Sequence, residues 1–346
     1  MSVRRLFLAR GLGEDRGVVL LDGRPERLLI VREGEPVSSR IGTRLAARVR
    51  KVEPAFASAF LDLGDGQEAL LAFKPDGRPV EGAMLEVEIR SEPRENKLAT
   101  VRAIGPVEGA PRLLAPAPDL SEQLRALVRD GDIVEGREAR RMADLAEAEA
   151  LETIHALPGG GTIAIEPTRA LVAIDVDLGE RKGQDAKRIT RQANLAALAT
   201  AARLLRLKGL GGIVVIDLVG RGHDGAALLA AARMAFAPDN PGVAIGPVGR
   251  FGTMDLSIPR RGRAIREILF DATGRPTDES LALRLIRQAE TEAVVQPGAR
   301  LVGACAPQIA ALAEPLAERL RARIGARFVL AVQADWPRDR LEVRLA

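Results

Sequence analysis

Alternating apolar and polar positions run through the first third of the chain. In residues 1–37 they surround Gly and Pro, as in GVVLLDGRPERLLIVREGEP, which predicts two or three strands joined by tight turns. Short strands continue from 38 to 105, most clearly in MLEVEIR, where Leu85, Val87 and Ile89 alternate with charged residues. About five short strands in roughly 70 residues predict a small β-barrel.

The pattern changes after this segment. Residues 105–119 are rich in Pro, Gly and Ala and have no sustained period, which predicts a linker. Charged stretches with helical character follow at 121–130 and 138–157, and the second ends at Pro158 and a run of glycines.

Beyond residue 158, apolar runs alternate with amphipathic stretches. Residues 170–177 (ALVAIDVD) and 213–219 (IVVIDLV) are typical of buried strands, and the stretch between them, 185–208, predicts a long helix capped by Gly209. This strand, helix and strand form a βαβ unit, so the two strands should be parallel. A similar mixture continues, with helices expected at 223–236, 279–292 and 306–324, a strand near 300 and two final strands.

Composition limits the kinds of site that the chain can hold. Its 346 residues are enough for two or three domains. The single cysteine, Cys305, excludes an internal disulfide and a thiolate metal cluster, and its apolar neighbours indicate a buried side chain. Because the only histidines are His155 and His223, any catalytic metal should have oxygen ligands.

Charge and hydropathy give weaker indications. A net charge of +4, from 51 basic and 47 acidic residues, favours a polyanionic partner only mildly. Aromatic residues make up 3% of the chain, so long stacking platforms are not expected. The N-terminal residues fit neither a signal nor a transit peptide, and no apolar run reaches the roughly 18 residues of a membrane span. We therefore expect a cytoplasmic protein.

Acidic residues gather where the two strands of the βαβ unit end. Asp175 and Asp177 close the first strand, and Asp217 closes the second. If the strands are neighbours, about 5 Å apart, these carboxylates could converge on one Mg²⁺, which prefers carboxylates and water as ligands. The alternative is that they cap a following helix or pair with Arg181, Lys182 or Arg221.

Basic residues accompany the same elements. Arg203, Arg206 and Lys208 end the long helix and are expected near the acidic edge. A second group consists of five arginines that could hold phosphates or be solvated surface charge. They are Arg250, Arg260, Arg261, Arg263 and Arg266.

The barrel segment combines aromatic and basic residues. Its aromatics are Phe56, Phe60 and Phe73, with Lys51, Lys74 and Lys97 close in sequence. An aromatic ring on a barrel surface can stack on a base while lysines follow the phosphates. A single Phe in a strand, however, is more often part of the core.

Several blocks of the sequence resemble the ribonuclease E and ribonuclease G family. The run RLAARVRKVEPAFASAFLDLGDGQEALL is similar to the opening of that family's OB-fold RNA-binding domain. GGGTIAIEPTRALVAIDVD, RQANLAALATAARLLRLKGLGGIVVIDLV and GRFGTMDLSIPRR resemble successive blocks of its catalytic domain, in the same order. The resemblance covers most of 1–105 and 158–346.

The resemblance implies an α/β multidomain fold. An OB-fold β-barrel is inserted in an RNase-H-like segment, and a DNase-I-like α/β catalytic domain and a small C-terminal α/β domain follow. The expected segments are the first RNase-H-like part at 1–37, the OB-fold at 38–105, a linker and helices replacing the 5′-sensor at 106–157, the catalytic-type domain at 158–265 and the C-terminal domain at 266–346.

The implied activity is Mg²⁺-dependent endonucleolytic cleavage of single-stranded, AU-rich RNA in RNA processing or decay. By position, Asp175 matches the family's first metal-binding aspartate, and we expect Asp177 and Asp217 to assist it. Phe60 and Lys97 match RNA contacts of the OB-fold, and Leu70 replaces a second aromatic contact. Further RNA contacts and stabilisation of developing charge are expected from Arg250, Arg260 and Arg261.

The sequence departs from the family's pattern in four ways. Gly220 stands where the family has its second metal-binding aspartate, although Asp224 could replace it, and Asp177 stands where the family has an Asn. The region that would hold the 5′-sensor is short. The paired cysteines that link subunits through zinc are missing, which excludes a zinc-linked tetramer and leaves a homodimer open. A catalytically impaired RNA-binding protein that keeps the fold is therefore the alternative hypothesis.

Overall fold

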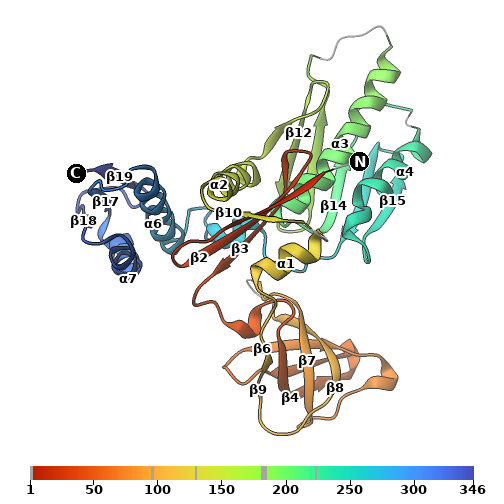
Figure 1. The fold of residues 1–346 in the computed structure, drawn as a ribbon. Coiled ribbons are helices and arrows are strands. Elements are labelled where there is room, and N and C mark those ends of the chain that lie inside the picture. Colours follow the sequence, from red (N-terminus) through yellow and green to blue (C-terminus); the bar gives the residue numbers. More distant parts are fainter. Residues whose placement is uncertain (1–2, 95–96, 129–130, 181–184, 223) are drawn as a thin grey trace. The chain divides into compact units, whose positions relative to one another are not determined.

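The computed structural model describes residues 3–94, 97–128, 131–180, 185–222 and 224–346 (Figure 1). The chain divides into two compact units, and both are assembled from segments that lie far apart in the sequence. The first unit contains Met1–Gly34, Leu120–Glu149 and Ile265–Ala346, and the second contains Glu35–Asp119 and Ala150–Ala264.

The first unit begins with a small sheet. The predicted strands of the N-terminal segment are β1 (Arg4–Ala9), β2 (Glu14–Leu21) and β3 (Arg24–Arg32), which pair in antiparallel order, while β10 (Ile133–Glu135) lies parallel to β1. Helix α1 (Leu120–Leu127) supplies two buried leucines to the core on this sheet.

The rest of the first unit is helical with a small sheet. Its elements are α2 (Arg137–Leu151), whose last two residues fall in the second unit, α5 (Ile265–Leu269), α6 (Asp278–Val295), β17 (Leu301–Cys305), α7 (Pro307–Ile324), β18 (Phe328–Val332) and β19 (Glu342–Leu345). Strand β17 lies between β18 and β19. Cys305 is fully buried in this core, as predicted, and burial raises the pKa of its thiol.

The barrel occupies the first part of the second unit. Its strands are β4 (Arg44–Glu53), β5 (Ser58–Asp62), β6 (Glu68–Ala72), β7 (Met84–Ser91), β8 (Ala99–Pro106) and β9 (Arg112–Ala115). The sheet order is β5-β6-β8-β7-β4-β9, and pairing of β5 with β4 closes it. Val87 and Ile89 face the barrel core, as their alternation predicts. Strand β9 was not predicted, since its residues belong to the expected linker. They form a strand because their backbone pairs with β4.

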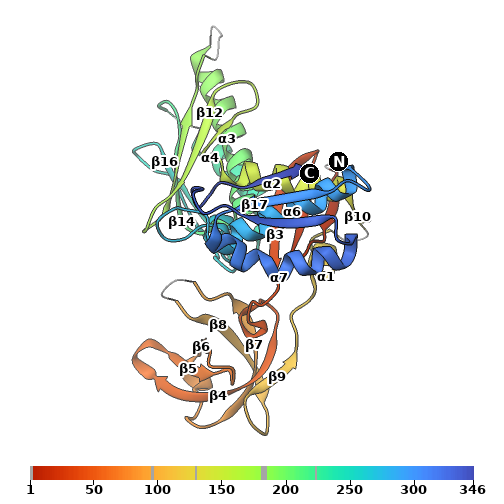
Figure 2. The same cartoon turned by 90° about the vertical axis from the view of Figure 1, so that its left-hand side faces the viewer.

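The second part of this unit is a sheet in the order β11-β12-β13-β14-β16-β15. Its elements are β11 (Ile154–Ala156), β12 (Thr162–Pro167), β13 (Val172–Asp177), α3 (Ala186–Lys208), β14 (Gly212–Asp217), α4 (Gly225–Phe236), β15 (Ala244–Val248) and β16 (Thr253–Ile258). Strands β13 and β14 are parallel, as the βαβ pattern predicts. Figure 2 shows α3 and α4 on the same side of this sheet.

Short 3-10 helices complete the fold at Val37–Ser39 (η1), Pro54–Phe56 (η2), Pro75–Gly77 (η3) and Ala237–Asp239 (η4). The charged stretch at 138–157 was expected to be helical, but its last residues form β11, because their backbone pairs with β12. The predicted α/β multidomain class with an OB-type barrel is confirmed. Across the described ranges, none of the helices combines the length and apolar character that a membrane span needs.

Candidate functional site

The sheet of β13 and β14 has two different faces. Val172, Ile174 and Val176 on β13, like Val214 and Ile216 on β14, are buried. Side chains alternate along a strand, so the residues between them point to the opposite face. There Asp175, Asp177 and Asp217 are all exposed. The three predicted ligands therefore lie on one face of the sheet, near the carboxyl ends of its two parallel strands.

Asp175 and Asp217 are direct neighbours across β13 and β14. They are Cα partners in the parallel register, and paired strands lie about 5 Å apart. Neither carboxylate has a hydrogen-bond or ion-pair partner among the described residues. Mg²⁺ in proteins is commonly held by one or two carboxylates together with water and substrate phosphates. The pair therefore fits a Mg²⁺ ion in donor type and number.

A three-ligand cluster is not assembled around this pair. No group of three or more His, Cys, Asp or Glu side chains in the described part of the chain could hold a metal. Asp177 lies two residues beyond Asp175, and its Oδ1 accepts a hydrogen bond from the Gly179 N–H at 2.7 Å. Arg181, Lys182 and His223, considered as neighbours or ligands, lie outside the described residues.

Asp224 has a structural role instead of the predicted replacement role. It is the N-cap of α4, where its Oδ1 accepts from the Ala227 N–H at 3.1 Å. Its other carboxylate oxygen lies 3.8 Å from Arg191. Both contacts hold the side chain at the start of the helix, so Asp224 does not join Asp175 and Asp217.

Gly220, just after β14, has a backbone conformation that suits glycine. Its φ is +85°, in the left-handed region that L side chains rarely adopt. A Cβ atom at this position would lie 2.5 Å from Cγ2 of Thr190 on α3. A side chain at position 220 would therefore meet both an unfavourable backbone conformation and Thr190.

Asn194 positions the backbone beside Gly220. It is fully buried on α3, and its Nδ2 donates to the Val219 carbonyl at 3.0 Å. The Val219 N–H donates to Asn194 Oδ1 at 3.1 Å. Sequence reasoning missed this residue, although a polar side chain between buried alanines of an amphipathic helix was the available signal.

An alanine in the left-handed conformation costs about 1–2 kcal/mol. We expect Gly220→Ala to lower the free energy of unfolding by more than this, because its Cβ would also overlap Thr190. Gly222→Ala is the matched control, since its φ is +67° but a Cβ there meets nothing within 4 Å. Urea unfolding should show a larger loss for Gly220→Ala than for Gly222→Ala. The difference in unfolding free energy between the two variants should shrink when Thr190 is also changed to Ser, which removes Cγ2. Equal losses for Gly220→Ala and Gly222→Ala, with or without Thr190→Ser, would contradict the steric argument.

The three predicted arginines, Arg250, Arg260 and Arg261, lie at opposite ends of the strands of this sheet. Arg250 is in the turn between β15 and β16, and this turn adjoins the end of β14 because the Leu218 N–H donates to the Gly252 carbonyl at 3.2 Å. Its guanidinium lies 4.7 Å from the centre of the exposed Phe251 ring. Of the three predicted arginines, Arg250 therefore shares the edge with Asp217.

Arg260 and Arg261 follow the other end of β16. Since β16 is antiparallel to β14, its last residue, Ile258, pairs with Gly212 at the start of β14. Five residues of strand, about 17 Å, separate that edge from Asp217. Arg261 Nη2 donates to the Pro241 carbonyl at 3.3 Å. Of the three arginines expected to stabilise developing charge, Arg260 and Arg261 therefore lie away from the carboxylates.

The basic residues at the end of α3 also lie away from the carboxylates. Lys208 is buried, and its Nζ donates to the carbonyls of Ala150, at 3.0 Å, and Glu152. Arg206 pairs with Asp239 at 2.6 Å. The prediction that they lie near the acidic edge is wrong, because a crossover helix runs antiparallel to its strands and ends at their opposite edge.

The barrel brings its predicted RNA contacts onto neighbouring strands. Phe60 on β5 is half-buried and pairs with Leu70 on β6. Lys97 is exposed just before β8, whose Ala99 pairs with Ala69 beside Leu70. We call Phe60, Leu70 and Lys97 the barrel face. The remaining aromatic side chains differ from Phe60, since Phe56 is 80% exposed and Phe73 packs against the barrel core.

Comparison with known proteins identifies relatives of the sheet region. Residues 119–261 match the model of the ribonuclease E/G family. Ribonuclease E of Haemophilus influenzae is 34% identical over 148 residues, which are 40% of this chain and 16% of that protein. Ribonuclease E of Escherichia coli is 33% identical over 148 residues, or 40% of this chain and 14% of that protein. Ribonuclease E of Buchnera aphidicola is 34% identical over 149 residues, covering 40% and 16%.

The chain thus matches only a small share of the length of these relatives. The matched segment contains the two parallel strands, their crossover helix and the paired carboxylates. The resemblance to the ribonuclease E/G family that the sequence indicates is therefore confirmed over residues 119–261.

Proposed function

We propose that this protein is a Mg²⁺-dependent endoribonuclease that cleaves single-stranded RNA in cytoplasmic RNA processing or decay. The observation that carries the proposal is the pairing of Asp175 with Asp217, two exposed carboxylates in register on adjacent parallel strands. The family match over the same segment supports it, since the relatives are named ribonuclease E.

In this proposal, Asp175 and Asp217 hold Mg²⁺, and Asp177 adds negative charge beside them. A Mg²⁺ ion bound there would supply stabilisation of phosphoryl charge and activation of water. Arg250, at the same edge, is placed to stabilise charge that develops on the phosphate. Asn194 keeps the end of β14 in place through its two hydrogen bonds with Val219.

The barrel face is the proposed holding site for the RNA strand. Phe60 offers a ring for base stacking, and Lys97 offers a cation for the phosphates. Arg260 and Arg261 lie too far along the sheet to act at the cleavage site, so we assign them to contacts with the RNA backbone. Stacking on a ring combined with contacts to phosphates suits binding with little sequence preference.

A catalytically impaired RNA-binding protein is the second candidate, and Gly220 favours it. Gly220 has a left-handed backbone, and a Cβ there would overlap Thr190, so the side chain of the family's second aspartate would not fit at this position. The two functions separate in one assay on the full chain, with a 5′-labelled, AU-rich single-stranded RNA. Cleavage with Mg²⁺ that stops with EDTA supports the enzyme, and tight binding without cleavage supports the second candidate.

We expect Phe60→Ala to weaken binding of a single-stranded RNA about 5-fold or more, because loss of one stacked base costs about 1–3 kcal/mol. Lys97→Ala should weaken binding and reduce the slope of log affinity against log salt concentration by about 0.7, the contribution of one phosphate contact. Fluorescence anisotropy over a salt series measures both quantities.

Phe56→Ala is the matched control, since Phe56 is also an aromatic of the barrel but lies outside the barrel face. It should bind as the wild type does. Wild-type affinity in both Phe60→Ala and Lys97→Ala would rule out the barrel face as the RNA contact.

A further inference from the structure

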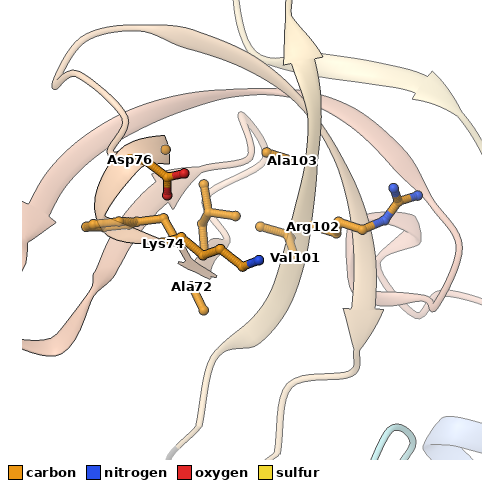
Figure 3. Close-up of a pocket in the computed structure, with 9 residues that line it drawn as sticks. Ala72, Lys74, Asp76, Val101, Arg102 and Ala103 are labelled. Atoms are coloured by element: carbon orange, nitrogen blue, oxygen red, sulfur yellow. The ribbon is translucent and has the colours of Figure 1, made fainter. Parts of the chain in front are cut away.

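A groove opens in the barrel where β6 and β8 separate. These strands pair in parallel through Leu71 and Val101, and β6 then ends at Ala72 while β8 continues. The chain after β6 turns away into η3, and the space left has a volume of about 460 Å³. We call it the Phe73 groove, and its lining residues are Leu71, Ala72, Phe73, Lys74, Asp76, Gly77, Val101, Arg102 and Ala103 (Figure 3).

The groove has an apolar floor with an aromatic ring. Leu71 and Val101 belong to the barrel core, and Phe73 packs against the same core. The Phe73 N–H donates to the Ala57 carbonyl at 2.9 Å, which fixes its backbone against the neighbouring turn. Ala72, Gly77 and Ala103 are small, so they leave space above this floor. The volume lies within the roughly 300–1,000 Å³ of small-molecule sites and can accept a nucleotide.

Positive charge lies at the sides of the groove. Lys74, in the loop after β6, is exposed, and its side chain has no hydrogen bond or ion pair among the described residues. Arg102 on β8 also lines the groove, but its guanidinium donates to Glu88 on β7 at 2.7 Å, on the side of β8 away from β6 (Figure 3). Asp76 is an opposing charge in the lining.

Glu88 holds Arg102 in place across a wide range of pH. Burial acts to raise the pKa of Glu88, but the hydrogen bonds from Arg102 and Arg90 outweigh it and keep the pKa below its ordinary value. The carboxylate therefore stays ionised at neutral pH. Since Glu88 holds the Arg102 guanidinium toward β7, Lys74 is the lining cation placed to meet a phosphate.

The groove is close enough to the barrel face for one strand to reach both. Leu70 and Phe73 are three residues apart, which is about 10 Å of extended chain. An OB-fold commonly covers about 4–16 nucleotides of a single strand. An RNA held at Phe60 therefore has sufficient length to continue into the groove.

We propose that the Phe73 groove binds a second nucleotide of the same RNA strand, with its base against Phe73 and its phosphate beside Lys74. This inference rests on the proposed function, because it needs single-stranded RNA at the barrel face. It extends that function by a contact that adds affinity for strands longer than the barrel face alone can hold.

The test measures binding of a 12-nucleotide single-stranded RNA to the full chain over a salt series. Lys74→Ala should reduce the salt slope by about 0.7. It should therefore bind about 5-fold more weakly than the wild type at about 0.1 M salt and about as well as the wild type at about 1 M salt. Phe73→Leu keeps an apolar side chain on the barrel core and should weaken binding about 5-fold or more through loss of the ring. Arg78→Ala is the control, since it removes an exposed positive charge just beyond η3 and outside the groove lining.

The outcomes separate the two proposals. If Phe60→Ala weakens binding while Lys74→Ala and Phe73→Leu bind as the wild type does, the groove is overturned and the proposed function stands. An equal effect of Arg78→Ala and Lys74→Ala would also overturn it, because general charge would then explain both. Should Phe73→Leu unfold the barrel, Lys74→Ala on the exposed loop still decides. Failure of the wild type to bind RNA would overturn both proposals.

Discussion

Asp175→Asn is expected to abolish Mg²⁺-dependent cleavage of single-stranded RNA and to leave RNA binding intact. Asn keeps the size of the side chain but removes the negative charge that, with Asp217, would hold the ion. Metal stabilisation of phosphoryl transfer is worth several kcal/mol, so loss of about 3 kcal/mol predicts a rate at least about 100-fold lower. Single-turnover cleavage of a 5′-labelled RNA, with anisotropy on the same RNA, measures rate and affinity separately.

Glu166→Gln is the matched control for the loss of one carboxylate. Glu166 on β12 is exposed on the same face of the sheet, where it pairs with Ala173 rather than with Asp175. Its variant should cleave at the wild-type rate. Undiminished cleavage by Asp175→Asn, or an equal loss in Glu166→Gln, would remove the Asp175 and Asp217 pair from the active site.

Glu14→Gln is expected to cause the largest loss of stability, about 3–5 kcal/mol, because it breaks a buried ion-pair network in the first unit. The Glu14 side chain is fully buried and accepts from Arg32 Nε at 2.8 Å and from Arg287 Nη1. Arg287 also donates to Glu147 at 3.3 Å. Burial lowers the pKa of Arg287, and the charge of Arg16 acts in the same direction. A neutral residue at 14 would leave buried guanidinium groups in excess.

Glu33→Gln is the control for this prediction. Glu33 also binds an arginine, Arg319, but 57% of its side chain and 45% of that of Arg319 are exposed. Exposed pairs contribute about 0–1 kcal/mol, so this variant should unfold at nearly the wild-type urea concentration. The two variants remove the same carboxylate charge within one unit. Similar unfolding midpoints for both would show that burial of the Glu14 network does not determine its contribution.

Elements with strong local signals could be predicted from the sequence. The long helix α3 ends at Lys208 and is capped by Gly209 at a φ of 68°, as its sequence predicts. Its N-cap, Asp185, accepts from the Arg188 N–H at 3.0 Å. Strand β9 could not be predicted, because Arg112–Ala115 has no alternating pattern and is extended through its pairing with β4.

The candidate site was predictable only in part. The positions of Asp175 and Asp217 at the ends of two parallel strands followed from the βαβ pattern, and their exact pairing came from the register of those strands. The lack of space for a side chain at Gly220 could not be foreseen, because it results from the position of Thr190, which lies 30 residues earlier on α3. The separation of Arg250 from Arg260 likewise depends on the antiparallel pairing of β16 with β14.

The sequence by itself determined the strands and helices with strong periodic or capping signals, such as β13, α3 and β14, the apolar face of each, and the carboxylates that close the two strands. These properties are local, because side-chain periodicity and capping act within a few residues. The tertiary structure alone decided which charged groups meet. It placed Arg250 at the same end of the strands as the carboxylates, placed Lys208 at the opposite end and opened the Phe73 groove. Strand order, register and chain reversal depend on pairing between residues far apart in the sequence.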